Sequence, residues 1–349
     1  MDTKIIRMDE ENIDMLAIEL AGSIIKSGGL VAFPTETVYG LGGDALNSSS
    51  SKKIYAAKGR PSDNPLIIHI VEMSALSRIV RKIPQAAYQL AEKYWPGPLT
   101  MIFDKAECVP LETTGGLDTV AVRMPSNQIA REFIRASGGY VAAPSANRSG
   151  RPSPTIAKYV IEDLAGRIDM IIDGGQADIG LESTIIDLTG SEPVILRPGY
   201  ITEEMLRQVI GDVEADQTIM EEHASQAPKA PGMKYKHYAP RGNLIIVEGE
   251  AGVVSAYINE RLSAFRREGK RTGVIATDET AAGYLADSVK SAGERDQEEQ
   301  AAKCLFRILR EFDDEKIDVI YAEGFRQKGV GQAVMNRLLK AAGHQVVRL

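Results

Sequence analysis

The stretch VAFPTETVYGLGGDALNSSSSKKIYAAKGRPSDNPLIIHI, residues 31–70, decides the fold class of this chain. Its opening apolar run predicts the end of a buried strand, and Pro34 ends that strand because proline has no N–H for the hydrogen-bond ladder. A helix over residues 49–57 and a second strand over residues 66–70 follow. The segment therefore predicts strands that alternate with helices, the pattern of an α/β protein.

Polar side chains follow the ends of these predicted elements. Thr35, Glu36 and Thr37 come directly after the first strand, and the helix delivers Lys58 and Arg60 into a turn rich in glycine and proline. Glycines let the backbone approach a ligand closely, and guanidinium groups match the oxygens of phosphates and carboxylates. The stretch therefore predicts a site for a polar, anionic ligand.

Composition limits the function classes. The chain has 349 residues, a size that favours two domains, and a formal net charge of −7, which disfavours general nucleic-acid binding. Its two cysteines, Cys108 and Cys304, have neither metal nor disulfide spacing and fit a reducing compartment. A signal-length apolar segment and a membrane-length apolar run are both missing, so we expect a cytoplasmic protein.

The chain divides at a polar stretch. Residues 1–210 are predicted to form one domain, residues 211–242 a linker, and residues 243–349 a smaller Rossmann-like βαβ domain with a helix over residues 281–289. The end of the linker, residues 231–240, is rich in large side chains and is expected to dock as a lid.

Helix starts are predicted from capping residues. Asn12 is expected to cap a helix that ends near Ser27, and Thr155 a helix over residues 156–164. Thr202, followed by two glutamates, is expected to cap a helix that ends near Ile210.

Four cations stand at strand ends or turns of the first domain: Lys58, Arg60, Arg123 and Arg197. A single surface cation is usually solvated, but four at such positions favour an anion site. The hydroxyls of Thr37, Thr119, Ser145, Ser153 and Ser183 also lie near turns, where such groups often only satisfy the backbone. His69 alone in a strand is more often packed than catalytic, and the four histidines have no metal spacing.

The sequence contains no convincing enzyme nucleophile. It has no GxSxG motif and no cysteine in a known motif. A reaction without an enzyme nucleophile is one in which two bound substrates react with each other, so catalysis would consist of positioning and charge stabilisation.

The combination of motifs resembles the YrdC-like family of L-threonylcarbamoyl-AMP synthases, in its long two-domain form. It comprises FPTETVYGLG (33–42), KGRPSDNPL (58–66), WPGPLT (95–100), GLDTVAVRMP (116–125), APSANRSGRPSPT (143–155), ESTIID (182–187), LRPG (196–199) and PGMKYKHYAP (231–240). The resemblance implies a twisted open α/β sheet with a concave active-site face. It also implies a nucleotidyltransferase that joins L-threonine, bicarbonate or CO₂, and ATP into threonylcarbamoyl-AMP and pyrophosphate.

The resemblance also implies site residues, cofactor and partners. L-Threonine would be held by Thr37, His69, Arg123, Ala143 and Ser183, and ATP by Arg60, Asn64, Thr119, Ser145, Ser153, Arg197 and Tyr235. Lys58 and Arg60 would stabilise phosphate charge, and Mg²⁺ would accompany ATP without an assigned protein ligand. A tRNA threonylcarbamoyl transferase would use the product to modify tRNA beside the anticodon, with no membrane and no strong direct nucleic-acid binding by this chain.

Two other functions remain open at this point. One is an RNA-binding module without turnover, which the net charge of −7 disfavours. The other is a carbamoyl-adenylating domain of the hydrogenase-maturation type, which carries additional domains not found here.

Overall fold

The computed structural model describes residues 2–216 and 238–349. Among these, residues 2–149 and 153–216 form one compact unit, and residues 150–152 and 238–349 form a second. The predicted domain bounds remain a prediction, and most of the predicted linker lies outside the described residues. None of the helices in the described ranges is long and apolar enough to span a membrane.

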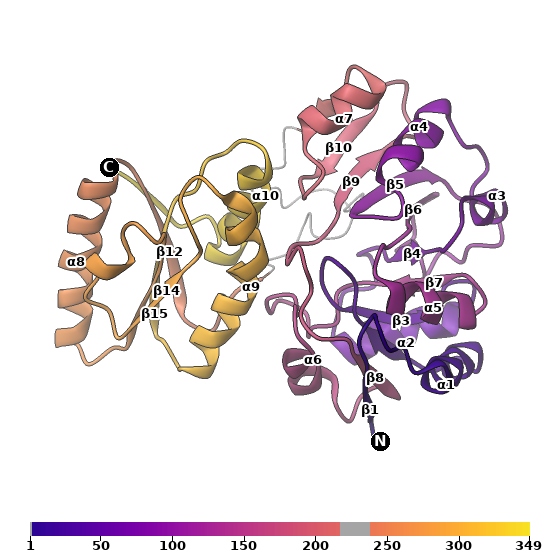
Figure 1. Cartoon of the computed structure of the whole chain (residues 1–349), viewed down its shortest axis with the longest axis horizontal. Helices are drawn as coiled ribbons and strands as arrows, with labels where there is room; N and C mark the ends of the chain where they lie inside the picture. Colours follow the sequence, from indigo (N-terminus) through magenta and orange to yellow (C-terminus); the bar gives the residue numbers. More distant parts are fainter. Residues whose placement is uncertain (1, 217–237) are drawn as a thin grey trace. The chain divides into compact units, whose positions relative to one another are not determined.

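The first unit is built on an eleven-stranded mixed sheet in the order β1-β8-β2-β3-β7-β4-β6-β5-β9-β10-β11 (Figure 1). Its strands are β1 (Lys4–Arg7), β2 (Val31–Phe33), β3 (Gly40–Asp44), β4 (Ile67–His69), β5 (Leu99–Asp104), β6 (Thr119–Arg123), β7 (Val141–Ala143), β8 (Met170–Asp173), β9 (Thr184–Asp187), β10 (Val194–Arg197) and β11 (Glu214–Ala215). Its helices are α1 (Met15–Lys26), α2 (Ser48–Lys58), α3 (Leu76–Ile79), α4 (Gln85–Tyr94), α5 (Gln128–Ala136), α6 (Ala157–Leu164) and α7 (Glu203–Ile210), with a 3₁₀ turn at Met73–Ala75.

Helices cover the sheet from both sides. Apolar side chains of α2, α3, α4, α6 and α7 form the larger core on one face. On the other face, α1 and α5 pack on β2, β7 and β8, for example Phe133 against Phe33 with ring centroids 5.0 Å apart. Beyond these two helices, the same face carries a separate small cluster of strand residues: Ile67, Ile102, Ala121, Ile185 and Leu196.

The predicted helix starts have mixed outcomes. Thr202 caps α7 as predicted, since its Oγ1 accepts from the N–H of Met205 at 3.2 Å. Asn12 is wrong as the cap of α1, because its amide donates to Asp9 and the carboxylate of Asp14 caps the helix instead. Thr155 is also wrong, because α6 begins after Ile156, whose side chain makes no cap hydrogen bond.

The second unit is a five-stranded parallel sheet in the order β14-β13-β15-β12-β16. Its elements are β12 (Asn243–Glu248), α8 (Ala251–Arg267), β13 (Thr272–Ala276), a 3₁₀ turn (Ala281–Gly283), β14 (Ser288–Ser291), α9 (Glu298–Asp314), β15 (Val319–Glu323), α10 (Val330–Ala342) and β16 (Val346–Arg348). Helix α8 covers one face, and α9 and α10 cover the other (Figure 1).

The helix predicted over residues 281–289 is wrong. Only a 3₁₀ turn forms there, and Ser288–Ser291 become strand β14, paired in parallel with β13. The edge of β13 offers unpaired backbone groups, and pairing with them outweighs the weak local preference of this short segment for a helix.

Candidate active site

The register of the central strands places predicted site residues in one row. His69 on β4 is paired with Arg123 on β6, Arg123 is paired with Thr100 on β5, and Thr100 with Ile185 on β9. Residues directly opposite each other on neighbouring strands point to the same face. The row continues to Arg197 on β10, which is paired with Ile185 next to a β-bulge.

Arg123 is buried and held by three groups. Its Nη2 lies 2.8 Å from Oε1 of Glu36, its Nη1 donates to Oγ1 of Thr37 at 2.8 Å, and its Nε donates to the carbonyl of Gly97 at 3.3 Å. The hydroxyl of Thr37 in turn lies 2.9 Å from that of Thr35. The turn after β2 therefore fixes the orientation of this guanidinium.

His69 is buried beside Arg123. Its Nδ1 lies 3.1 Å from the carbonyl oxygen of Ile67, and its ring meets the edge of Phe33 at a centroid distance of 5.9 Å. Burial, and then the positive charge of Arg123, lower the pKa of His69 to about 3. The imidazole is therefore neutral at physiological pH.

A second guanidinium is linked to the same row through hydroxyls. Arg197 donates from Nε to the carbonyl of Ser183 at 3.0 Å and from Nη2 to its Oγ at 3.2 Å. The Ser183 hydroxyl lies 2.7 Å from that of Thr100. Strands β5, β9 and β10 thus connect the surroundings of the two arginines.

Lys58 anchors the loop that carries the predicted nucleotide residues. Its buried ammonium donates to the carbonyl oxygens of Ser145 and Asn147 and lies 3.4 Å from Oδ1 of Asn147. The Ser145 hydroxyl donates to the same Oδ1 at 2.5 Å. Lys58 therefore shapes this loop, whereas the sequence predicts only that it neutralises phosphate charge.

Arg60 and Asn64 precede β4, and Thr119 begins β6, at the end of these parallel strands opposite to His69 and Arg123. Arg60 donates to the carbonyl oxygens of Asn64 and Pro65 at 3.2 and 3.1 Å. Within the described residues, the buried Oδ1 of Asn64 has no hydrogen-bond partner. Thr119 begins β6 on the face of Arg123, four residues and roughly 13 Å away along the strand.

The remaining predicted residues are placed less centrally or not at all. Ala143 ends β7, opposite Ile67 of β4. Ser153 is buried and donates to Oε1 of Glu182 at 2.6 Å. Tyr235 lies outside the described residues.

Comparisons with known proteins agree over nearly the whole chain. A Sua5, YciO and YrdC family model described as "Telomere recombination" matches residues 23–199, and one described as "Threonylcarbamoyl-AMP synthase, C-terminal domain" matches residues 201–343. The threonylcarbamoyl-AMP synthases of Pyrococcus abyssi and Bacillus subtilis are 49% and 47% identical and cover 97% of this chain, which covers 98% and 97% of theirs.

A solved structure is equally similar. P. abyssi Sua5 complexed with L-threonine is 47% identical, with a TM-score of 0.93 and 100% of each chain covered. The chain belongs to the threonylcarbamoyl-AMP synthase family. The predicted α/β fold with a YrdC-like domain and a second Sua5-type domain is thereby confirmed.

Two partners in this synthase-family site were not predicted from the sequence. Glu36 and Thr100 stand in the motifs FPTETVYGLG and WPGPLT, but no site role is predicted for either. Both acquire partners through long-range pairing, Glu36 with Arg123 and Thr100 with Ser183. One local feature of the sequence could have indicated a partner for Glu36. It directly follows a buried strand, and burial of a carboxylate there costs free energy unless a cation lies near it.

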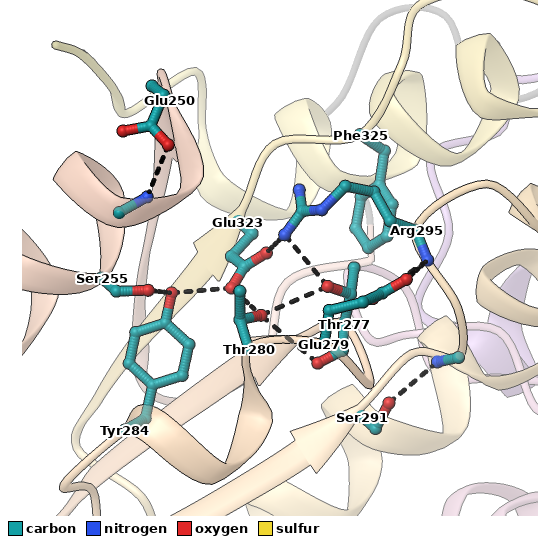
Figure 2. Close-up of polar contacts among 12 residues, drawn as sticks. Glu250, Ser255, Thr277, Glu279, Thr280, Tyr284, Ser291, Arg295, Glu323 and Phe325 are labelled. Carbon is teal, nitrogen blue, oxygen red and sulfur yellow. Dashed lines mark hydrogen bonds and ion pairs between the residues drawn. The ribbon is translucent and has the colours of Figure 1, made fainter.

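The second unit carries a polar network of its own at the carboxyl end of β15. Figure 2 shows Glu323, which is buried, between Thr280, Tyr284 and Arg295. The hydroxyls of Thr280 and Tyr284 donate to Oε1 at 2.5 and 2.7 Å, and Arg295 donates to Oε2. Both carboxylate oxygens are satisfied internally, so this network stabilises the connections after β13 and β14.

Proposed function

We propose that this chain catalyses the formation of threonylcarbamoyl-AMP and pyrophosphate from L-threonine, bicarbonate or CO₂, and ATP. The amine of threonine takes up bicarbonate with loss of water, or CO₂ with loss of a proton, and becomes a carbamate. A carbamate oxygen then attacks the α-phosphorus, and pyrophosphate leaves. The observation that carries this proposal is the row from His69 through Arg123 and Thr100 to Arg197, in a chain that aligns over its full length with a threonine-bound relative.

The threonine end of the site is proposed to lie at Arg123. Its guanidinium faces the turn after β2, with Thr37 within hydrogen-bond distance, and would receive the threonine carboxylate. The neutral His69 lies opposite Arg123 on β4, the backbone at Ala143 lies one strand further away on β7, and Ser183 is linked to Thr100 on β5. The side-chain hydroxyl of threonine would be recognised by these polar groups.

The nucleotide end is proposed to extend along β6 towards Thr119. Asn64 supports this assignment, because its buried Oδ1 has no hydrogen-bond partner among the residues that the structure describes and suits a donor such as the exocyclic amine of adenine. Arg60 and Arg197 would meet the phosphates, and Ser145 and Ser153 would contribute hydroxyls. The distance of roughly 13 Å between Thr119 and Arg123 suits an elongated product with an amino acid at one end and adenosine at the other.

The chemistry needs no covalent intermediate with the protein. The site residues bring two substrates together and stabilise negative charge on the α-phosphate through positioned guanidinium groups, with Lys58 adding a fixed positive charge behind the loop at Ser145. Mg²⁺ would arrive with ATP as part of the substrate. Among the residues that the structure describes, no three or more His, Cys, Asp or Glu are arranged to hold a metal.

The product would pass to a tRNA threonylcarbamoyl transferase in the cytoplasm. An RNA-binding module without turnover finds no support in the comparisons, which name synthases. The hydroxyl of threonine predicts the substrate order. Serine lacks only a methyl group, worth about 1–3 kcal/mol, whereas valine would leave polar groups of the site unpaired.

The deciding experiment is mass spectrometry of products after incubation with ATP, Mg²⁺, bicarbonate and threonine. We expect the mass of threonylcarbamoyl-AMP and one pyrophosphate per product molecule, with serine used better than valine. Removal of both bicarbonate and dissolved CO₂ should abolish the product. ATP-independent, salt-sensitive RNA binding without pyrophosphate release would instead support the RNA-binding module.

A further inference from the structure

Glu36 is a buried carboxylate with acceptor capacity to spare. It follows β2 in the motif PTET, and its side chain is only 6% exposed. Its Oε1 lies 2.8 Å from Nη2 of Arg123. Apart from this ion pair, neither oxygen of Glu36 has a hydrogen-bond partner among the described residues. An ionised carboxylate offers about four acceptor positions, so Glu36 can accept further N–H donors.

The charges of the pair decide which ligand fits. Glu36 and Arg123 together carry no net charge, and both are buried. A ligand with only a carboxylate would bring one uncompensated negative charge into this place, at a substantial cost in desolvation. A zwitterion brings none, because its positive end meets Glu36 while its negative end meets Arg123.

The spacing also fits an α-amino acid. Its ammonium and carboxylate are attached to the same carbon, so nitrogen and the nearer oxygen lie roughly 3 Å apart. The 2.8 Å between Oε1 of Glu36 and Nη2 of Arg123 is of the same size. The ammonium would then lie against Glu36 and the carboxylate against Arg123 at the same time.

Neighbouring groups do not offer the same partner. His69, the titratable group on β4, is neutral, and the hydroxyls of Thr35 and Thr37 bond to each other. The carboxylate of Glu182 already accepts from Ser153 at 2.6 Å. Glu36 thus pairs one oxygen, Oε1, with the guanidinium, while its buried Oε2 has no hydrogen-bond partner among the described residues.

We propose that Glu36 binds the α-ammonium of threonine while Arg123 binds its carboxylate, so that the pair selects the zwitterion. This inference rests on the proposed function. It adds a binding residue that neither the motif resemblance nor the arrangement of cations assigns.

Calorimetric titration of the full chain with three ligands tests the proposal. L-Threonine carries both charges, 2,3-dihydroxybutanoate replaces the ammonium with a hydroxyl, and 1-amino-2-propanol lacks the carboxylate. The wild-type protein should bind threonine at least tenfold more tightly than either analogue. Equal binding of threonine and 2,3-dihydroxybutanoate by the wild type would overturn the proposal without any variant.

The same titrations with variants of Glu36 test the role of its negative charge. Glu36→Gln keeps the shape but frees the charge of Arg123, so threonine should bind at least tenfold more weakly and the preference over 2,3-dihydroxybutanoate should disappear or reverse. Glu36→Asp keeps the charge and should keep the preference for the zwitterion. Glu112→Gln removes a surface carboxylate that pairs with Lys52 at 3.1 Å in the same unit, and should change neither affinity.

The outcomes are distinct. If Glu36→Gln weakens all ligands but keeps the wild-type order, Glu36 has only a structural role and the proposal is wrong. The same holds if Glu36→Gln binds threonine as the wild type does. If the wild type binds no threonine at all, the proposed function fails, and this inference with it.

Discussion

Thr100 and Ser183 share a buried hydrogen bond, with 2.7 Å between their hydroxyl oxygens. Thr100 lies on β5 directly opposite Arg123, and Ser183 receives a hydrogen bond from Arg197. The hydroxyl pair therefore connects β5, the strand next to Arg123, with the guanidinium of Arg197. Because both side chains are at most 1% exposed, water cannot replace either partner.

This hydrogen bond predicts that substitutions of Thr100 and Ser183 have non-additive effects on the free energy of unfolding. Thr100→Val alone leaves a buried hydroxyl with one partner fewer, and Ser183→Ala alone leaves the Thr100 hydroxyl unpaired, at a cost of about 1–3 kcal/mol. The double variant should cost clearly less than the sum of the two single variants. Urea unfolding, followed by the fluorescence of the single tryptophan, Trp95, measures these free energies for the first unit.

Ser77→Ala serves as the matched control, since this exposed hydroxyl donates to the carbonyl of Ser74 within its own turn. It should change the unfolding free energy by less than about 0.5 kcal/mol. Strict additivity of Thr100→Val and Ser183→Ala would show that the hydroxyl pair does not act as a unit.

The low pKa of His69 predicts that the free energy of unfolding decreases at acidic pH. Its folded-state pKa of about 3 lies below the ordinary value of 6.5, so below pH 6.5 the unfolded chain binds a proton that the folded chain does not. The stability that this neutral histidine contributes is complete above pH 6.5 and is lost as the pH falls from 6.5 towards 3. The local slope approaches about 1.4 kcal/mol per pH unit.

Urea unfolding at pH 7, 6, 5 and 4, again with Trp95 as the probe, measures the effect. His69→Gln should reduce the slope of the unfolding free energy against pH by up to about 1.4 kcal/mol per pH unit. It should also lower the unfolding free energy at pH 7. His344→Asn, in the second unit, should leave the profile of the Trp95 transition unchanged. Parallel profiles for the wild type and His69→Gln would contradict the prediction.

The sequence predicts one part of this site and misses another for a physical reason. Arg123 and Arg197 were recognised because a cation after an apolar run marks a strand end, which is local information. Their connection through Thr100 and Ser183 depends on the order and register of β6, β5, β9 and β10, which no local pattern specifies. For the same reason Glu36 was seen as polar, but its burial and its partner were not.

The second unit gives the converse case. Alternating strands and helices predicted its parallel sheet, because each element there has a strong local pattern. Residues 281–289 were misassigned because a short apolar run does not distinguish a strand from a helix, and pairing with β13 decided the outcome. The roles proposed for individual ligand-binding residues remain predictions.

Lys58 predicts a loss of order in the loop at Ser145. Its ammonium is buried and donates to the carbonyls of Ser145 and Asn147, so Lys58→Met should remove both of these hydrogen bonds. We expect a stability loss of about 2–4 kcal/mol and at least tenfold weaker ATP binding. Arginine should not rescue it, because a planar guanidinium does not fit the compact ammonium position.

Hydrogen exchange separates this loop effect from a direct phosphate contact. In Lys58→Met the amide of Ser149, which donates to the carbonyl of Lys58, should exchange faster even without nucleotide. Lys93→Met, an exposed lysine in the last turn of α4, is the matched control and should alter neither exchange nor ATP affinity. Weaker ATP binding with unchanged exchange in this loop would indicate that Lys58 acts on phosphate alone.

The contacts of Glu323 predict that its substitution strongly destabilises the second unit. Its carboxylate accepts from Thr280, Tyr284 and Arg295 and connects β15 with the segments after β13 and β14 (Figure 2). Glu323→Ala removes all three acceptor contacts and leaves a partly buried guanidinium without its carboxylate, so about 3–5 kcal/mol of stability should be lost. Hydrogen exchange of the β15 amides, residues 319–323, should accelerate accordingly, whereas Glu260→Ala, on the exposed side of α8, should not change it.

Because the network is internally satisfied, Glu323→Ala should also leave threonine affinity in the first unit within twofold of the wild type. A larger loss would show that the network acts on the active site as well as on its own unit.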